Sequence, residues 1–169
     1  MGKLDKLQPA AVWNIFEKMS AIPRGSGNEA GVMTMFKAWS DERGLAWKED
    51  AVGNLLIQIP ATKGLEKAAP VLIQGHVDMV CEKNAATKHD FAKDPIRIQV
   101  QGDWVTADGT TLGSHNGIGV AAMLAVQLGA MRVLLRDPEG KTPWYQGMGI
   151  LFYISGMMIA ATALRGIGG

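Results

Sequence analysis

The 169-residue chain has a single cysteine, Cys81, so an internal disulfide is excluded and a reducing compartment is expected. The chain also has no large excess of charge of either sign, because it contains 17 Lys and Arg and 16 Asp and Glu. No basic stripe indicates nucleic-acid binding. The N-terminus lacks the uninterrupted apolar core of a secretory signal. We therefore expect a cytoplasmic protein, one domain long, without a nucleic-acid partner.

Charged residues are absent from a long stretch near the C-terminus. Residues 142–164 contain no Asp, Glu, Lys, Arg or His, and Glu139 is the last acidic residue of the chain. The run approaches the ~20 residues that cross a bilayer. Because glycine interrupts it, we predict a buried strand over Ile150–Ser155 and a small-residue helix packed on the same sheet, rather than a membrane partner. Contact of this run with a membrane or another protein remains the alternative.

Apolar periodicity predicts helices and strands in mixed order. Helices are expected from Pro9, from a capping box made by Ser26 and Glu29, and over 117–128. The predicted strands are 46–49, 54–59, 71–74, 96–100 and 104–106. Residues 71–74 are too continuously apolar for an edge strand and are placed at the centre of the sheet. The order of elements predicts an α/β sandwich.

A His-x-Asp pair follows this predicted central strand. Val71–Gln74 leads through Gly75 into His76 and Asp78. Imidazole and carboxylate are zinc ligands, and a strand that ends in glycine can place them at the carboxyl edge of a sheet. Asp78 lies close enough in sequence to accept a hydrogen bond from the second ring nitrogen of His76, which would fix its tautomer. A glycine-punctuated loop with His115 at its centre follows some thirty residues later.

Several ordered blocks up to about residue 126 resemble the aminoacyl-histidine dipeptidases (Xaa-His dipeptidases) of the zinc dipeptidase, acylase and carboxypeptidase superfamily. The blocks are Ile22–Glu29, Asp50–Leu55, Gly75–Val80 and Gly102–Gly113. The resemblance, clear over residues 7–126, implies a mixed-sheet fold of the zinc exopeptidase type, here truncated and without a lid domain. It also implies hydrolysis of Xaa-His and other dipeptides, with His76 as a zinc ligand and Asp78 as the catalytic residue beside it.

His115 departs from the pattern of the family that the chain resembles. The family has Gly-Ala-Asp-Asn-Gly, in which the Asp bridges two zinc ions, where this chain has Gly113-Ser114-His115-Asn116-Gly117. An imidazole offers one lone pair at a time and cancels no charge, so it does not replace a bridging carboxylate. Two outcomes stay open: one zinc ion held by His76 and His115, or no metal.

The Glu-Glu pair of the resembled family is also missing. By resemblance one Glu is the general base and the other a zinc ligand, but the plausible counterpart, residues 149–157, has no acidic residue. We therefore expect residues 1–126 to be the N-terminal part of a catalytic domain and residues 127–169 to be a divergent apolar segment. The expected activity on short peptides is weak or absent. Completion of the site in a homo-oligomer is the alternative.

Two smaller features are assigned ordinary roles. Cys81 could offer a thiolate to zinc, but it has no cysteine partner, and a small buried hydrophobic role is preferred. His89 and Asp90 fall in a polar stretch and are expected to be solvated.

Overall fold

A computed structural model describes residues 2–61, 66–127 and 150–155 of the chain. Its elements, in chain order, are α1 (Ala10–Ser20), α2 (Ala30–Asp41), β1 (Ala46–Glu49), β2 (Leu55–Ile59), β3 (Val71–His76), β4 (Ile98–Gln101), β5 (Trp104–Ala107), α3 (Ser114–Gln127) and β6 (Ile150–Ser155). The strand predicted over Ile150–Ser155 is therefore confirmed, whereas the small-residue helix predicted after it lies outside the described residues.

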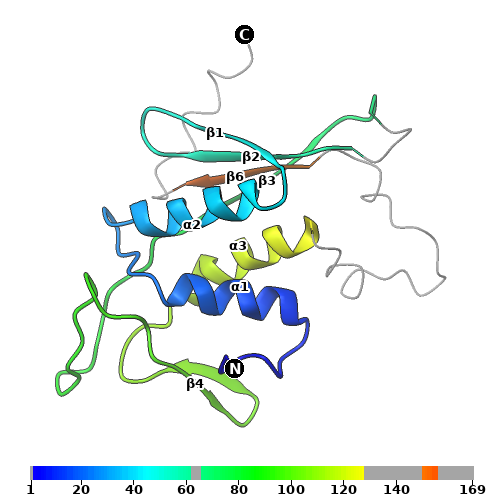
Figure 1. Cartoon of the computed structure of the whole chain (residues 1–169). Coiled ribbons are helices and arrows are strands. Elements are labelled where there is room, and N and C mark those ends of the chain that lie inside the picture. The colour runs from blue at the N-terminus through cyan, green and yellow to red at the C-terminus, as the bar shows by residue number, and fades with distance from the viewer. Residues whose placement is uncertain (1, 62–65, 128–149, 156–169) are drawn as a thin grey trace.

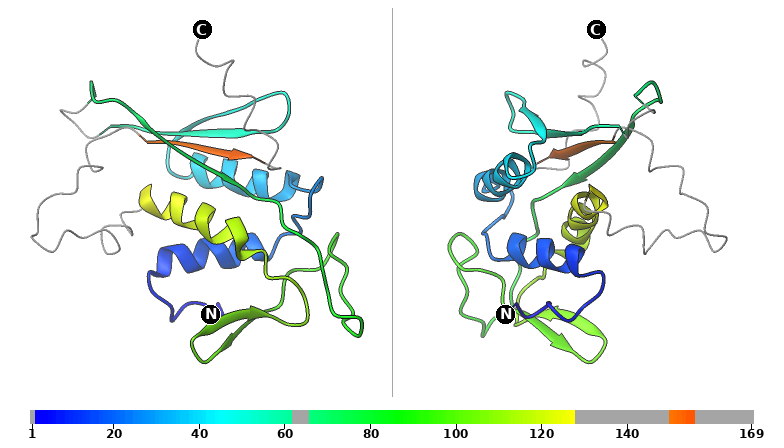
Figure 2. Two further views of the ribbon diagram at one scale, coloured as in Figure 1. Left: turned by 180° about the vertical axis from the view of Figure 1, so that it is seen from behind. Right: turned by 45° about the vertical axis from the view of Figure 1, so that its right-hand side comes forward.

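A four-stranded mixed sheet forms the top layer of the molecule in Figure 1, with the order β1-β2-β6-β3. β1 and β2 pair antiparallel, as do β2 and β6, whereas β3 and β6 run parallel. Helices α2 and α3 cover one face of the sheet, α1 packs on the far side of α3, and the β4–β5 hairpin lies beyond α1 (Figures 1 and 2). The predicted α/β class with a mixed sheet is confirmed.

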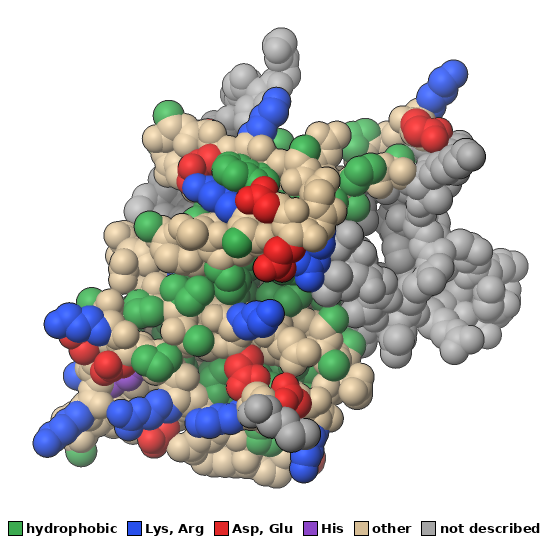
Figure 3. All heavy atoms as spheres, viewed as in Figure 1, with side chains coloured by type: hydrophobic (Ala, Val, Ile, Leu, Met, Phe, Trp, Pro, Cys, Tyr) green, Lys and Arg blue, Asp and Glu red, His purple; other side chains and the backbone are tan. Residues whose placement is uncertain are grey.

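The core lies between the helices and the sheet. The predicted apolar stripe of α1 is buried, and α2 contributes Phe36 and Trp39. In α2, Met33 is buried as well, whereas Met35 is only half-buried. On the outside, Lys and Arg side chains lie beside Asp and Glu side chains over the face shown in Figure 3.

The prediction that residues 71–74 form a central strand was wrong. Within the described sheet β3 is the end strand, and β6 takes the central position between β2 and β3. The side chains of β3 alternate accordingly: Val71 and Ile73 are half-buried, whereas Leu72 and Gln74 are exposed. An unbroken apolar sequence shows that both faces tolerate apolar side chains, but it does not specify which strands pair on either side.

Helix starts also differ from the sequence prediction. α2 begins after Glu29 without a side-chain cap, so the predicted capping box does not form. The Glu29 carboxylate instead accepts a hydrogen bond from the Gly27 amide at 2.7 Å. α3 begins at Ser114, three residues earlier than predicted, which places His115 in its first turn and not at the centre of a loop.

Candidate metal-binding site

The end of β3 and helix α3 approach closely because Gly75 has no side chain. A Cβ atom at Gly75 would lie 2.8 Å from Cγ2 of Val120 and 3.1 Å from Sδ of Met123. Real Cβ atoms do not come that close to other heavy atoms, so α3 can rest at this distance only over glycine. The close approach brings His76, the last residue of β3, near His115, in the first turn of α3.

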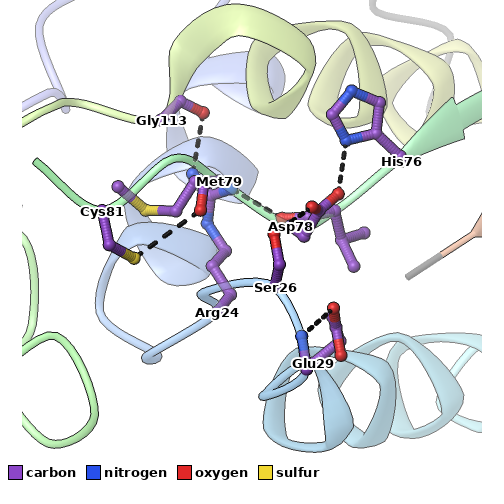
Figure 4. A network of polar contacts seen from close by, with 10 residues as sticks. Arg24, Ser26, Glu29, His76, Asp78, Met79, Cys81 and Gly113 are labelled. Carbon is purple, nitrogen blue, oxygen red and sulfur yellow. Dashed lines mark hydrogen bonds and ion pairs between the residues drawn. The ribbon is translucent and has the colours of Figure 1, made fainter. Parts of the chain in front are cut away.

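His76 is buried, with 7% of its surface exposed, and its two ring nitrogens have different surroundings. Nδ1 lies 2.7 Å from Oδ1 of Asp78 (Figure 4). Nε2 is also buried and has no hydrogen-bond partner among the described residues. A buried nitrogen without a partner is costly in a folded protein. An imidazole held through Nδ1 with Nε2 free is the arrangement of a metal-ligating histidine.

Asp78 is held at both carboxylate oxygens. Oδ1 faces His76, and Oδ2 accepts a hydrogen bond of 2.6 Å from Oγ of Ser26. Figure 4 shows Asp78 between the two partners, with Ser26 contributed by the turn before α2. Both contacts are short, as is usual for hydrogen bonds to an ionised acceptor. The contact between His76 and Asp78 was expected from the sequence, whereas Ser26 was expected to cap α2 and not to contact Asp78.

Arg24 lies beneath the site and connects its two halves. Its guanidinium donates to the carbonyl of Val77 at 2.6 Å and to the carbonyl of Gly113 at 2.8 Å (Figure 4). Burial lowers the pKa of Arg24 to about 10, an effect that the nearby Asp78 carboxylate partly opposes. The guanidinium therefore remains charged at neutral pH. Two carbonyls and one carboxylate stabilise this buried charge and fix the main chain beside both histidines.

His115 is exposed and faces the same hollow as His76. The ring centroids of His76 and His115 are 5.8 Å apart, with 45° between their planes. A zinc–nitrogen bond of about 2.0–2.1 Å places each ring centre about 3 Å from the ion, so two imidazoles at this separation could share one ion. The hollow, of about 420 Å³, is lined by His76, Asp78, Met79, Val80, Thr111, Leu112, Gly113, Ser114 and His115.

The donor set around the hollow is small. In the described part of the chain, no group of three or more His, Cys, Asp or Glu side chains is arranged to hold a metal ion. Asp78 is already engaged by His76 and Ser26. Among the described residues that line the hollow, the two imidazoles are thus the uncommitted donors, with Nε2 of His76 the one that is buried without a partner, and the set lacks the free carboxylate that a bridged pair of ions requires.

Cys81 and His89 have surroundings that differ from a ligand site. Cys81 is half-buried, its thiol donates to the Met79 carbonyl at 3.6 Å, and burial raises the pKa of the thiol, so the thiolate is disfavoured at neutral pH. The expectation that His89 is solvated was wrong. His89 is buried, packs at 4.5 Å against the ring of Phe91, and its carbonyl accepts a hydrogen bond from Lys83.

Comparison with known proteins finds dipeptidases, although no family model matches the chain. Over 126 residues the chain is 48% identical to cytosol non-specific dipeptidase of Escherichia coli, covering 75% of this chain and 26% of that protein. The structure of aminoacylhistidine dipeptidase from Vibrio alginolyticus matches with a TM-score of 0.77 and 38% identity, over 94% of this chain and 30% of that one. A tripeptidase from Staphylococcus aureus, at 22% identity and a TM-score of 0.62, shares the fold. The chain thus spans about a quarter of its curated dipeptidase relative.

A second similarity involves a different protein. Over 53 residues the chain is 60% identical to the bacteriochlorophyll synthase 33 kDa chain of Cereibacter sphaeroides. This match covers 31% of the present chain and 17% of that protein.

Proposed function

We propose, from the premise that residues 7–126 resemble the N-terminal part of the aminoacyl-histidine dipeptidases, that this chain carries a partial metal site of the dipeptidase type. One observation carries the proposal: Nε2 of His76 is buried without a partner while Nδ1 is held by Asp78. This is the geometry in which an imidazole presents its lone pair to a metal ion. The expected substrates are short peptides, His-containing dipeptides among them, and the expected location is cytoplasmic, in line with the name of the E. coli relative.

Each residue of the proposed site has a separate role. His76 and His115 would hold the ion, and Asp78 would keep the His76 ring in place and its Nε2 unprotonated. Zinc in this position supplies a Lewis acid for hydrolysis. The hollow beside the two histidines has room for a small peptide group, since Val80, Leu112 and the backbone of Gly113 form its walls.

We expect at most one zinc ion per chain. The support is chemical, because His115 stands where the resembled family has a bridging carboxylate, and an imidazole does not bridge two cations. A measurement of zinc per purified chain tests this directly. A value of two ions would contradict the proposed site.

We expect peptidase activity to be weak or absent. Asp78 is the one carboxylate among the described residues that line the hollow, and both of its oxygens already have hydrogen-bond partners. A reaction that lacks its general base loses on the order of 10²–10⁴ in rate. Activity completed by a second copy of the chain is the alternative, and it would show a dependence of the specific rate on protein concentration.

The deciding experiment combines zinc stoichiometry with hydrolysis of several dipeptides in zinc- or manganese-supplemented buffer. His76→Ala serves as the variant without a site, and His89→Ala as a matched control, because His89 is a buried histidine outside the hollow. Loss of metal binding in the first variant alone supports the proposal. Equal metal binding in all three proteins would refute it.

A second candidate function concerns the uncharged run of residues 142–164. We infer that this run, which has no Asp, Glu, Lys, Arg or His, contacts an apolar partner. No helix in the described ranges is long and apolar enough to cross a membrane. Flotation of the whole chain with phosphatidylcholine vesicles tests this candidate: recovery with the vesicles supports it, and recovery only in the dense fraction refutes it.

A further inference from the structure

The Ser26 hydroxyl is directed at the Asp78 carboxylate and not at the helix that follows it, α2. Ser26 and Glu29 have the spacing of a capping box, yet α2 begins without a side-chain cap. Ser26 Oγ lies 2.6 Å from Oδ2 of Asp78, across 52 residues of sequence. The N-cap position of α2 is Glu29, so Ser26 stands three residues before it and does not cap the helix. Its hydroxyl bonds instead to a carboxylate that already touches a histidine.

The backbone around Ser26 is fixed to the backbone around Asp78. The Met79 amide donates to the Arg24 carbonyl at 3.0 Å, and Gly25 and Met79 form a parallel bridge. The Arg24 side chain is bonded to the Val77 carbonyl at the same place. These contacts hold the 24–26 segment against the 77–79 segment, so the Ser26–Asp78 distance does not depend on either side chain alone.

The three side chains form one directed row of hydrogen bonds. The Ser26 hydroxyl donates to Oδ2 of Asp78, and Oδ1 of Asp78 then accepts from Nδ1 of His76. With Nδ1 as the donor, Nε2 carries the lone pair, and Nε2 is the buried nitrogen without a partner. If Ser26 were removed, the carboxylate could rotate about its terminal bond, because the Ser26 hydroxyl is the one hydrogen-bond partner of Oδ2 among the described residues.

We propose that Ser26 is a positioning residue that fixes the orientation of the Asp78 carboxylate and, through it, the tautomer and ring orientation of His76. The inference rests on the proposed metal-binding role of His76, but its first consequence is visible without any metal. In the free chain His76 is held as the Nδ1–H tautomer. In a metal-loaded chain the same restraint keeps Nε2 directed at the ion.

The test compares the whole chain with Ser26→Ala, Ser26→Thr and the control Thr34→Ala. Thr34 is a second exposed hydroxyl of the same region, but it donates to the Ala30 carbonyl within α2. The first readout is the pair of ¹⁵N chemical shifts of the His76 ring in metal-free protein, which reports the tautomer, with His76→Ala identifying the signals. The second readout is the dissociation constant for Co²⁺, measured by competition with a chromophoric chelator.

We expect Ser26→Ala to mix the two tautomers of His76 and to weaken Co²⁺ binding about tenfold, the lower end of the effect of groups that orient a metal-ligating histidine. Ser26→Thr, which keeps the hydroxyl, restores both readouts, and Thr34→Ala changes neither. An unchanged tautomer and unchanged Co²⁺ binding in Ser26→Ala would overturn the inference. If His76→Ala also binds Co²⁺ as the parent does, the proposed metal site itself fails, and the tautomer readout alone then decides the role of Ser26.

Discussion

Replacing Gly75 by alanine tests whether the contact between β3 and α3 sets the geometry of the site. The new methyl group would lie 2.8 Å from Cγ2 of Val120, a buried side chain that is stiff at χ1 because it is β-branched and helical. Overpacking of this kind costs about 1–3 kcal/mol. Alanine in a strand recovers about 0.5–1 kcal/mol relative to glycine. The middle of these two ranges gives a net loss of about 1.2 kcal/mol in the free energy of unfolding, or about 2–5 °C in Tm for a chain of this size.

Combining Gly75→Ala with Val120→Ala tests whether these two residues are in contact. Val120→Ala alone removes buried methyl groups and leaves a cavity, for a loss of about 2 kcal/mol. In the double variant the alanine methyl at position 75 occupies the space that Val120 has vacated. The double variant should thus be about 1–2 kcal/mol more stable than the sum of the two single losses predicts, within the range measured for residues in contact.

The assay is urea unfolding followed by tryptophan fluorescence, which the five tryptophans of the chain permit. Gly119→Ala is the matched control, because a Cβ there meets only Oδ1 of Asn116 at 3.3 Å and alanine favours a helix. That variant should be as stable as the parent or more stable by up to about 1 kcal/mol. A Gly75→Ala chain with unchanged stability, or losses that simply add in the double variant, would show that β3 and α3 are not in the contact described.

Three further predictions concern the site and the single thiol. His115→Asp should tighten zinc binding by about tenfold or more, equivalent to at least about 1.4 kcal/mol, because a carboxylate adds charge and a second donor oxygen; unchanged binding in equilibrium dialysis would mean that His115 does not contact the ion. In metal-supplemented buffer the parent chain should hydrolyse dipeptides no faster than His76→Ala does. Robust turnover by the parent that vanishes in His76→Ala would instead show that the chain is an active dipeptidase. Partial burial raises the pKa of the Cys81 thiol, so its reaction with a disulfide reagent at neutral pH should be several-fold slower in the folded than in the urea-unfolded chain. Equal rates would contradict the half-buried position of the thiol.

Local features of the fold were predictable because local sequence decides them. The helical stripe of α1, the strands around the turn at Asp50, and the strand that leads into His76 follow from apolar period and turn residues. The contact between His76 and Asp78 was predictable for the same reason, since only one residue separates them.

Long-range features were not predictable in this way. Which strand lies beside β3 depends on the pairing of residues far apart in the chain, and the apolar run of 71–74 does not encode it. The destination of the Ser26 hydroxyl is decided by the bridge between Gly25 and Met79, which leaves no mark in the local pattern. His115 was misplaced because its helix starts at Ser114, although glycine at 117 and 119 made a later start the natural expectation.

The central place of β6 has a consequence for the order in which the chain folds. β2 and β3 do not pair with each other, and both pair with a strand that begins at Ile150. The described sheet therefore closes only when β6 has joined β2 and β3, at the entropic cost of closing loops of many tens of residues. Contacts of such high sequence separation slow folding. Before β6 pairs, the facing edges of β2 and β3 present unpaired backbone groups, and such edges are the sites at which partly folded chains associate edge to edge.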